Sequence, residues 1–250
     1  MNKMLNALYR TALQAGAGIM TGGIMLSFLA DGHVSGFLVK LVAVMALVGA
    51  ILYSLRASRL GEDWSPKSLA TVSTWAFALA SLLALILHLA MPFQKFLVDL
   101  LAYVAAFAGL ISAISVTSNL LASRWGASRG TLLGAYCLTT ILAVGALTTL
   151  IPGEVLLPMK EQAVFAIIGS LASWGTISLL VDHYREAAST PGGLISLSPQ
   201  RGVLNRILLW VGILLLMMGV VGAFIGTYLL AAVLVLLGHL LLSYVLCQGE

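Results

Sequence analysis

The sequence predicts an all-α, polytopic membrane protein, a bundle of about eight transmembrane helices. Of the 250 residues, 60% are hydrophobic and only 9% are charged, and the mean hydropathy is +1.05. Water-soluble domains carry about 25% charged residues, so this composition indicates a lipid environment. The apolar runs are continuous over about 20 residues, as spanning helices require, and do not alternate as they would in a membrane β-barrel.

Each predicted helix is an apolar run bounded by charged residues or by breaks rich in Pro and Gly. Lys3 and Arg10 precede the first run, as in a signal peptide, but the run is long enough to span and no clear Ala-x-Ala site precedes Asp31. It is therefore predicted to be a retained helix. Residues 207–246 carry no charge, and the glycines of GVVGAFIGT predict a tight turn that divides them into two spans. The predicted spans are 11–30, 37–56, 68–92, 97–122, 130–151, 163–182, 205–223 and 226–247.

The positions of the cations predict how the helices are oriented. Three of the 13 lysines and arginines, Lys40, Lys95 and Lys160, fall on the side opposite to the N-terminus, and the other ten fall on the N-terminal side. Cytoplasmic segments carry the excess of positive charge, so both termini are predicted to be cytoplasmic, in the inner membrane. Residues 1–250 are predicted to form one integral membrane domain that contacts lipid and does not bind nucleic acid. The role of the Ser-, Gly- and Pro-rich cytoplasmic segment 183–206 is left open.

Small residues predict close packing between helices. The first span contains AGAGIMTGG, and Gly222 and Gly226 form a GxxxG pattern near the last turn. Glycine allows helix backbones to approach closely in lipid, where no hydrophobic effect drives helices together. Cys137 and Cys247 are predicted to be unpaired packing residues, and no metal-ligand spacing occurs. No internal repeat is apparent from the sequence.

A polar cluster interrupts the apolar sequence where the third predicted span ends. His88 precedes Pro92 by about one helical turn, Gln94 and Lys95 follow in the connection, and Asp99 lies at the start of the next span. We expect His88 and Asp99 to meet near the outer boundary of the membrane. An imidazole beside a carboxylate can accept and transfer a proton near neutral pH. The alternative is that His88 caps its helix and Asp99 complements the dipole of the next helix.

The stretch ILHLAMPFQKF resembles the His-Leu-Gly-x-Pro signature of the membrane anchor subunits of dimethyl sulfoxide reductase-type molybdoenzymes, with Ala90 in place of the family glycine. SRWGASRGTLLGAY (123–136) is faintly similar to a second stretch of that family. The resemblance implies an eight-helix anchor that oxidises menaquinol or another quinol near the outer face, with His88 in quinol binding. It also implies two partners, an iron–sulfur electron-transfer subunit and a molybdenum-cofactor catalytic subunit.

His239 is predicted to be the most deeply placed ionisable side chain of the bundle. Bis-histidyl haem needs two imidazoles at one depth, and His88 and His239 differ in depth by about 14 Å, so no haem is predicted. We expect the neutral imidazole of His239 to form a hydrogen bond with a neighbouring helix.

The leading prediction is therefore a membrane anchor subunit of a respiratory oxidoreductase, in which His88 accepts a proton from quinol and Asp99 or solvent passes it outward. Such a chain would be a quinol-oxidising subunit of a complex and not a stand-alone enzyme. Two alternatives remain open. Asp99, His239 and the glycine-rich helices would line a path in a small-solute transporter or permease, and a charge-poor bundle also suits a non-catalytic membrane assembly protein.

Overall fold

The computed structural model describes residues 2–29, 33–60, 68–91, 93–122, 127–151, 159–189 and 199–246. Over these residues the chain is all-helical, with eight helices and no strand, which confirms the predicted fold class. The helices are α1 (Asn2–Leu29), α2 (Gly36–Leu60), α3 (Leu69–Ala90), α4 (Lys95–Ala122), α5 (Ala127–Thr148), α6 (Met159–Ser189), α7 (Pro199–Phe224) and α8 (Tyr228–Leu246).

Several helices extend beyond the predicted apolar spans. α1 begins at Asn2 and not near residue 11, α6 continues to Ser189, and α7 begins at Pro199, so much of the predicted loop 183–206 is helical. The reason is that hydropathy marks only the part of a helix in hydrocarbon, whereas backbone hydrogen bonding continues into the polar interface. Pro92 and Cys247 lie outside the described residues.

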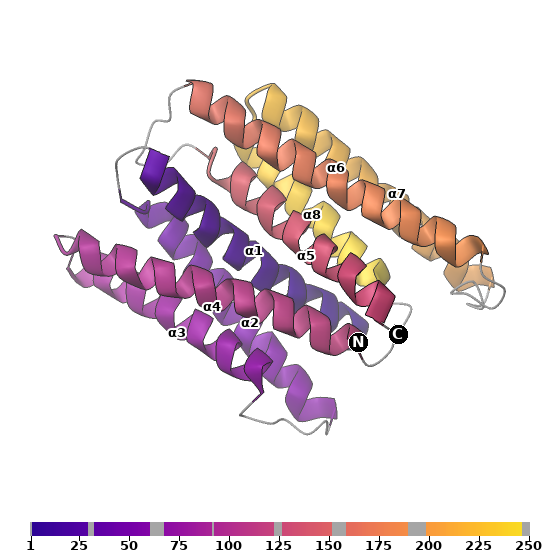
Figure 1. Ribbon diagram of the computed structural model, residues 1–250, viewed down its shortest axis with the longest axis horizontal. Coiled ribbons are helices and arrows are strands. Elements are labelled where there is room, and N and C mark those ends of the chain that lie inside the picture. Colours follow the sequence, from indigo (N-terminus) through magenta and orange to yellow (C-terminus); the bar gives the residue numbers. More distant parts are fainter. Residues whose placement is uncertain are drawn as a thin grey trace.

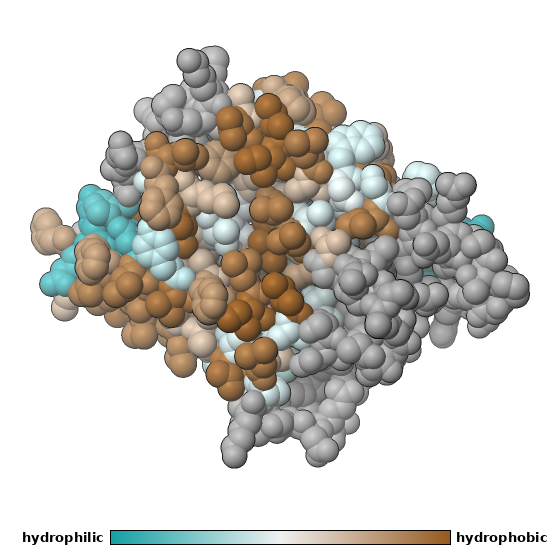
Figure 2. All heavy atoms as spheres, in the orientation of Figure 1, coloured by the Kyte–Doolittle hydropathy of each residue, from teal (hydrophilic) through white to brown (hydrophobic). Residues whose placement is uncertain are grey.

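The helices have the length and surface of a multi-pass integral membrane protein. Seven of them are long and apolar enough to cross a membrane, and the described part of α5 contributes a shorter apolar stretch, Ala135–Thr148. Large apolar side chains such as Phe107, Leu171 and Trp210 are more than half exposed, and apolar atoms cover much of the face shown in Figure 2. Such a surface would be unfavourable in water, so it indicates contact with lipid.

The eight helices run roughly along one direction and pack around α1 (Figure 1). α1 contacts α2, α4, α5 and α8, while α5 contacts α1, α4, α6 and α8. α3 packs on α2 and α4 on one side of the bundle, and α7 packs on α6 and α8 on the other. The start of α1 and the end of α8 lie at the same end of the bundle, here called the terminal end. The opposite end, here called the hairpin end, carries residues 33–35, 91, 93–94 and 225–227, which follow α1, α3 and α7.

Glycines bring α1 and α5 into backbone contact, which confirms the predicted packing role of the first glycine-rich segment. A methyl group added at Gly18 or at Gly145 would collide with a backbone carbonyl of the other helix, and one added at Gly22 would lie 2.6 Å from the carbonyl oxygen of Gly145. Such close approach strengthens dispersion contacts between helices in lipid.

Gly226 has a different role from the one that a GxxxG motif predicts. Its φ of 82° is in the left-handed region that favours glycine, and it lies in the turn between α7 and α8. No atom lies within 4 Å of the position that a side chain would take there. The predicted tight turn is thus confirmed, whereas Gly222 and Gly226 do not form a helix-packing pair.

Candidate functional site

Three ionisable side chains converge on residues 33–36 at the hairpin end. Asp99, in the first turns of α4, places its Oδ2 atom 2.5 Å from Nδ1 of His33, and its Oδ1 atom accepts a hydrogen bond of 3.0 Å from the backbone N–H of Val34. The Asp99 side chain is 17% exposed and that of His33 is 51% exposed. Asp99 therefore fixes the segment that leads into α2 and orients an imidazole that faces the surroundings.

His88 lies against the other side of the same segment. It occupies the last turn of α3, is half-buried, and packs its ring on Gly36, the first residue of α2. A methyl group at Gly36 would collide with the imidazole ring, so only glycine leaves room for His88 there. Within the described residues no hydrogen bond joins His88 to Asp99, so the expected pair does not form and His33 takes that place.

The other two predicted site residues lie at the rim of this end. Gln94 precedes α4, where its carbonyl oxygen accepts hydrogen bonds from the N–H groups of Leu97 and Val98, and Lys95 is the first residue of α4. Both side chains are exposed. In Figure 2 a hydrophilic area appears at the end of the molecule where Figure 1 shows the α3–α4 connection. Gln94 and Lys95 thus lie on the surface of the hairpin end.

Aromatic side chains also lie at the hairpin end. Tyr103 lies one turn after Asp99 on α4, and its ring is 5.9 Å from that of Phe28 at the end of α1. Phe93 and Phe96 are 96% and 75% exposed. The hairpin end therefore combines titratable groups with an apolar aromatic surface, an arrangement that suits a lipophilic molecule with a polar head.

A second group of polar side chains lies inside the bundle and was largely missed by the sequence reading. Asn6, Arg10 and Gln14 follow one another at four-residue spacing on α1, and all three are buried. Arg10, which the sequence reading counted with the cytoplasmic cations, is only 2% exposed. The four-residue spacing, which places side chains on one helical face, was the available signal.

Gln14 connects α1 to α4 and α5. Its Nε2 donates a hydrogen bond of 3.3 Å to Oγ1 of Thr117, which itself donates to the carbonyl of Ala113. The Gln14 and Thr117 side chains also lie close to the Cys137 thiol on α5. The Oε1 atom of Gln14 is buried and has no hydrogen-bond partner among the described residues.

His239 connects α8 to α5 at a similar depth. It is fully buried, its Nδ1 lies 3.2 Å from Oγ1 of Thr140, and its ring packs edge-on against Tyr136 at 6.0 Å. The predicted hydrogen bond to a neighbouring helix is thus confirmed. The Thr140 hydroxyl donates to the carbonyl of Tyr136 at 2.8 Å, so its oxygen accepts from an Nδ1–H group. His239 Nε2 then carries a lone pair, and it has no partner in the described part of the chain.

These side chains form one polar layer between α1, α4, α5 and α8; most of them lie near the middle of their helices, whereas Thr117 and Ser243 lie in the last two turns of α4 and α8. Residues 136–140 span about one helical turn, roughly 6 Å, halfway along α5, and His239 is near the middle of α8. The Tyr136 hydroxyl also lies 3.2 Å from Oγ of Ser243. We call this set the mid-depth layer: Gln14, Thr117, Tyr136, Cys137, Thr140, His239 and Ser243.

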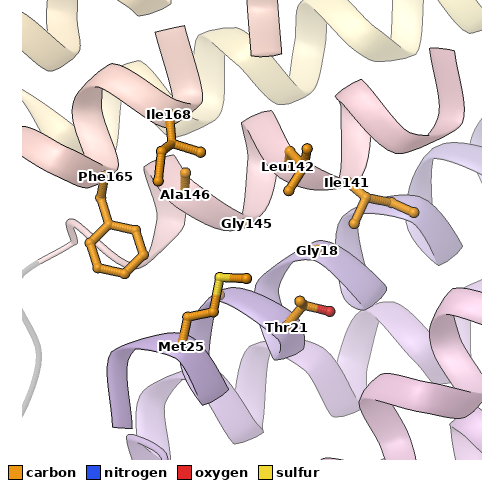
Figure 3. Close-up of a pocket in the computed structure, with 10 residues that line it drawn as sticks. Gly18, Thr21, Met25, Ile141, Leu142, Gly145, Ala146, Phe165 and Ile168 are labelled. Atoms are coloured by element: carbon orange, nitrogen blue, oxygen red, sulfur yellow. The ribbon is translucent and has the colours of Figure 1, made fainter. Parts of the chain in front are cut away.

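Towards the hairpin end the contact between α1 and α5 becomes apolar. A small cavity of about 20 Å³ lies beside Gly18 and Gly145, and the side chains of Met25, Phe165 and Ile168 surround it (Figure 3). Its lining is almost wholly apolar. This region therefore serves packing.

Comparison with protein-family models, with curated proteins and with solved structures gives no match. The two polar groups of the bundle and the stretch around His88 are therefore the features that bear on function.

Proposed function

We propose that the chain is a membrane anchor subunit of a respiratory oxidoreductase that binds and oxidises a quinol at the hairpin end. The observation that carries the proposal is the position of His88 and of the His33–Asp99 pair on either side of residues 33–36, beside lipid-facing aromatic side chains. A quinol has an apolar ring and tail and two hydroxyl groups, so it needs both a lipid-facing surface and a proton acceptor.

In this proposal His88 accepts a proton from a quinol hydroxyl. Oxidation of a quinol to a quinone releases two protons and two electrons, and the electrons pass to an iron–sulfur centre of a partner subunit. The partner would belong to a complex with a molybdenum-cofactor catalytic subunit, as the resemblance implies. The half-buried position of His88 at the end of α3 suits this role, because its ring is held by Gly36 and still reaches the surface.

The proposed proton exit runs through His33 and not through Asp99 alone. Both carboxylate oxygens of Asp99 already have partners, so Asp99 acts as a positioning residue that orients the His33 ring. His33 is half-exposed and can exchange protons with water. The orientation of the chain belongs to the same proposal, since the excess of cations on the terminal side supports cytoplasmic termini and a hairpin end on the outer face.

The experiment that tests this function measures binding of menadiol and of a short-tailed menaquinone to the purified chain in lipid nanodiscs. We expect His88→Ala to raise Kd at least tenfold and Asp99→Asn to raise it less. Leu79→Ala is the matched control, because this α3 side chain is 55% exposed and lies more than two turns away from His88. If wild-type protein and His88→Ala bind both compounds equally, or neither binds, the proposal is wrong.

A second measurement separates binding from turnover once a partner complex is purified. His88→Ala should abolish quinol-dependent turnover and leave turnover with an artificial electron donor unchanged. Equal loss with both donors would point to disrupted assembly and would contradict the proposed role of His88.

A further inference from the structure

The helix contacts divide the bundle into two equivalent halves of four helices. In the first half α1 packs on α2, α2 on α3, α3 on α4 and α4 on α1, and α5 to α8 repeat this ring in the same order. Three helix pairs join the halves: α1 with α5, α1 with α8, and α4 with α5. Exchanging the halves converts the α1–α8 pair into the α5–α4 pair and leaves the α1–α5 pair as it is, so the same three pairs result. This pattern is the one that a two-fold axis parallel to the helices would produce.

The equivalence extends to individual residues. A single shift along the sequence carries four residues of α1 onto identical residues of α5: Leu5 onto Leu132, Tyr9 onto Tyr136, Gly18 onto Gly145, and Thr21 onto Thr148. Gly18 and Gly145 face each other: a methyl group on Gly145 would collide with the carbonyl of Gly18, and one on Gly18 would lie 3.1 Å from the backbone nitrogen of Gly145 and would collide with the carbonyl of Ile141, one turn earlier on α5. The hydroxyls of Thr21 and Thr148 make the same hydrogen bond to the carbonyl four residues earlier.

The two repeats have the same orientation in the membrane. Each contains an even number of helices, so the second repeat begins at the end of the bundle where the first one began. In membrane proteins built from two repeats, binding sites commonly lie near the middle of the membrane at the interface between the repeats.

The mid-depth layer occupies this interface. Gln14 and Thr117 come from the first repeat, whereas Cys137, Thr140 and His239 come from the second. Two acceptors in the layer are unused, Oε1 of Gln14 and Nε2 of His239, on side chains that are 1% and 0% exposed. An unused acceptor in a buried site is costly, and more so in a membrane, so this pair suggests that a donor is supplied from outside the protein.

We propose that the interface between the two repeats holds a mid-depth binding site for a small, uncharged, water-soluble molecule with O–H or N–H donors, a simple amide or polyol. Gln14 Oε1 and His239 Nε2 accept hydrogen bonds from this ligand. The Arg10 guanidinium, on the same buried face of α1 as Gln14, disfavours a cation. The ligand enters from the terminal end, because the glycine contact between α1 and α5 closes the interface towards the hairpin end.

The test uses alkylation of Cys137 by iodoacetamide, a small amide that carries N–H donors, in liposomes that contain the full chain with Cys247→Ser. The thiol loses its proton to buffer, a carbon–sulfur bond forms and iodide leaves. We expect Cys137 to react at least tenfold faster than a control thiol introduced by Leu147→Cys in the Cys137→Ala, Cys247→Ser background. Leu147 is equally buried on α5 but faces Gly169 of α6, within one repeat.

Acetamide, the unreactive analogue, should slow alkylation of Cys137 and should not affect the Leu147→Cys control. Gln14→Met should slow the reaction at least tenfold, and His239→Leu should do the same. Protection of Cys137 by acetamide is measured without Gln14→Met or His239→Leu, so it tests the proposed site even if either of these variants fails to fold. The proposal is overturned if Cys137 is as unreactive as the control or if acetamide gives no protection. Binding of menadiol at His88 should not change in Gln14→Met, so failure here is distinguishable from failure of the quinol proposal.

Discussion

Asp99 shows how one side chain organises the hairpin end. Its two oxygens hold His33 and the N–H of Val34, which joins the start of α2 to α4. The sequence predicted that Asp99 lies at the start of its helix, as it does, but paired it with His88, the nearest histidine along the chain. Its actual partner is 66 residues away, and only the folded connection between α1 and α2 brings the two together.

Two substitutions measure how much the hydrogen bonds of Asp99 contribute to the free energy of unfolding. Asp99→Ala removes both acceptors and should lower the free energy of unfolding by about 1–2 kcal/mol. Asp99→Asn retains one amide oxygen for the Val34 N–H and should lower the free energy by roughly half as much. Unfolding in mixed micelles, followed by circular dichroism, measures both. Equal stability of wild type and Asp99→Ala would show that these hydrogen bonds contribute nothing.

Ser81 and Thr74 offer a matched pair on α3. Both are fully buried, but the Thr74 hydroxyl lies 2.7 Å from that of Ser112, whereas the Ser81 hydroxyl has no partner within the described chain. Ser81→Ala should therefore stabilise the protein by about 1 kcal/mol, and Thr74→Val should destabilise it by about 0.5–1.5 kcal/mol. Thermal unfolding of the two variants side by side gives the comparison, and the same sign for both would refute this reasoning.

At the scale of helices, hydropathy predicted the number of elements and their order but not their buried faces. The eight apolar runs correspond to eight helices because backbone groups in lipid must be paired internally. Hydropathy placed the start of the first span after Arg10, and therefore missed the buried polar face of Asn6, Arg10 and Gln14. A buried polar face is recognised only once the neighbouring helices are known.

In the turn between α7 and α8, a substitution of Gly226 tests the effect of backbone conformation alone on stability. Gly226→Ala should lower the free energy of unfolding by about 1–2 kcal/mol, because φ is 82° and no neighbouring atom obstructs a side chain. Gly175→Ala, within α6, is the control and should be less destabilising than Gly226→Ala, because alanine favours a helix more than glycine does and this gain offsets the tight contact with the Thr139 methyl at 3.3 Å. Unfolding of both variants in the same detergent tests this, and an unaffected Gly226→Ala would contradict a requirement for glycine.

At the scale of the whole molecule, the two equivalent repeats were not apparent from the sequence. Only a few residues match between the repeats, and lipid-facing positions accept many apolar side chains, so the common architecture leaves little trace in the sequence. The helix contacts reveal it because packing depends on where small residues lie, as at Gly18 and Gly145.

The proposed orientation predicts which side of the membrane each end faces. In intact cells or right-side-out vesicles, a thiol introduced by Lys95→Cys should react with an impermeant maleimide from outside. A thiol introduced by Arg206→Cys should react only after the membrane is opened. Both side chains are exposed, so burial does not decide the result. Labelling of Arg206→Cys alone in sealed vesicles would reverse the orientation and would place the His88 cluster on the cytoplasmic face.

The short connection between α7 and α8 has a consequence for biogenesis. Residues 207–246 carry no charge, and only residues 225–227 separate the two helices. Delivering this hairpin across the bilayer therefore requires transfer of one brief turn and no charged group, so the two helices can partition from the translocation machinery together as a pre-paired unit.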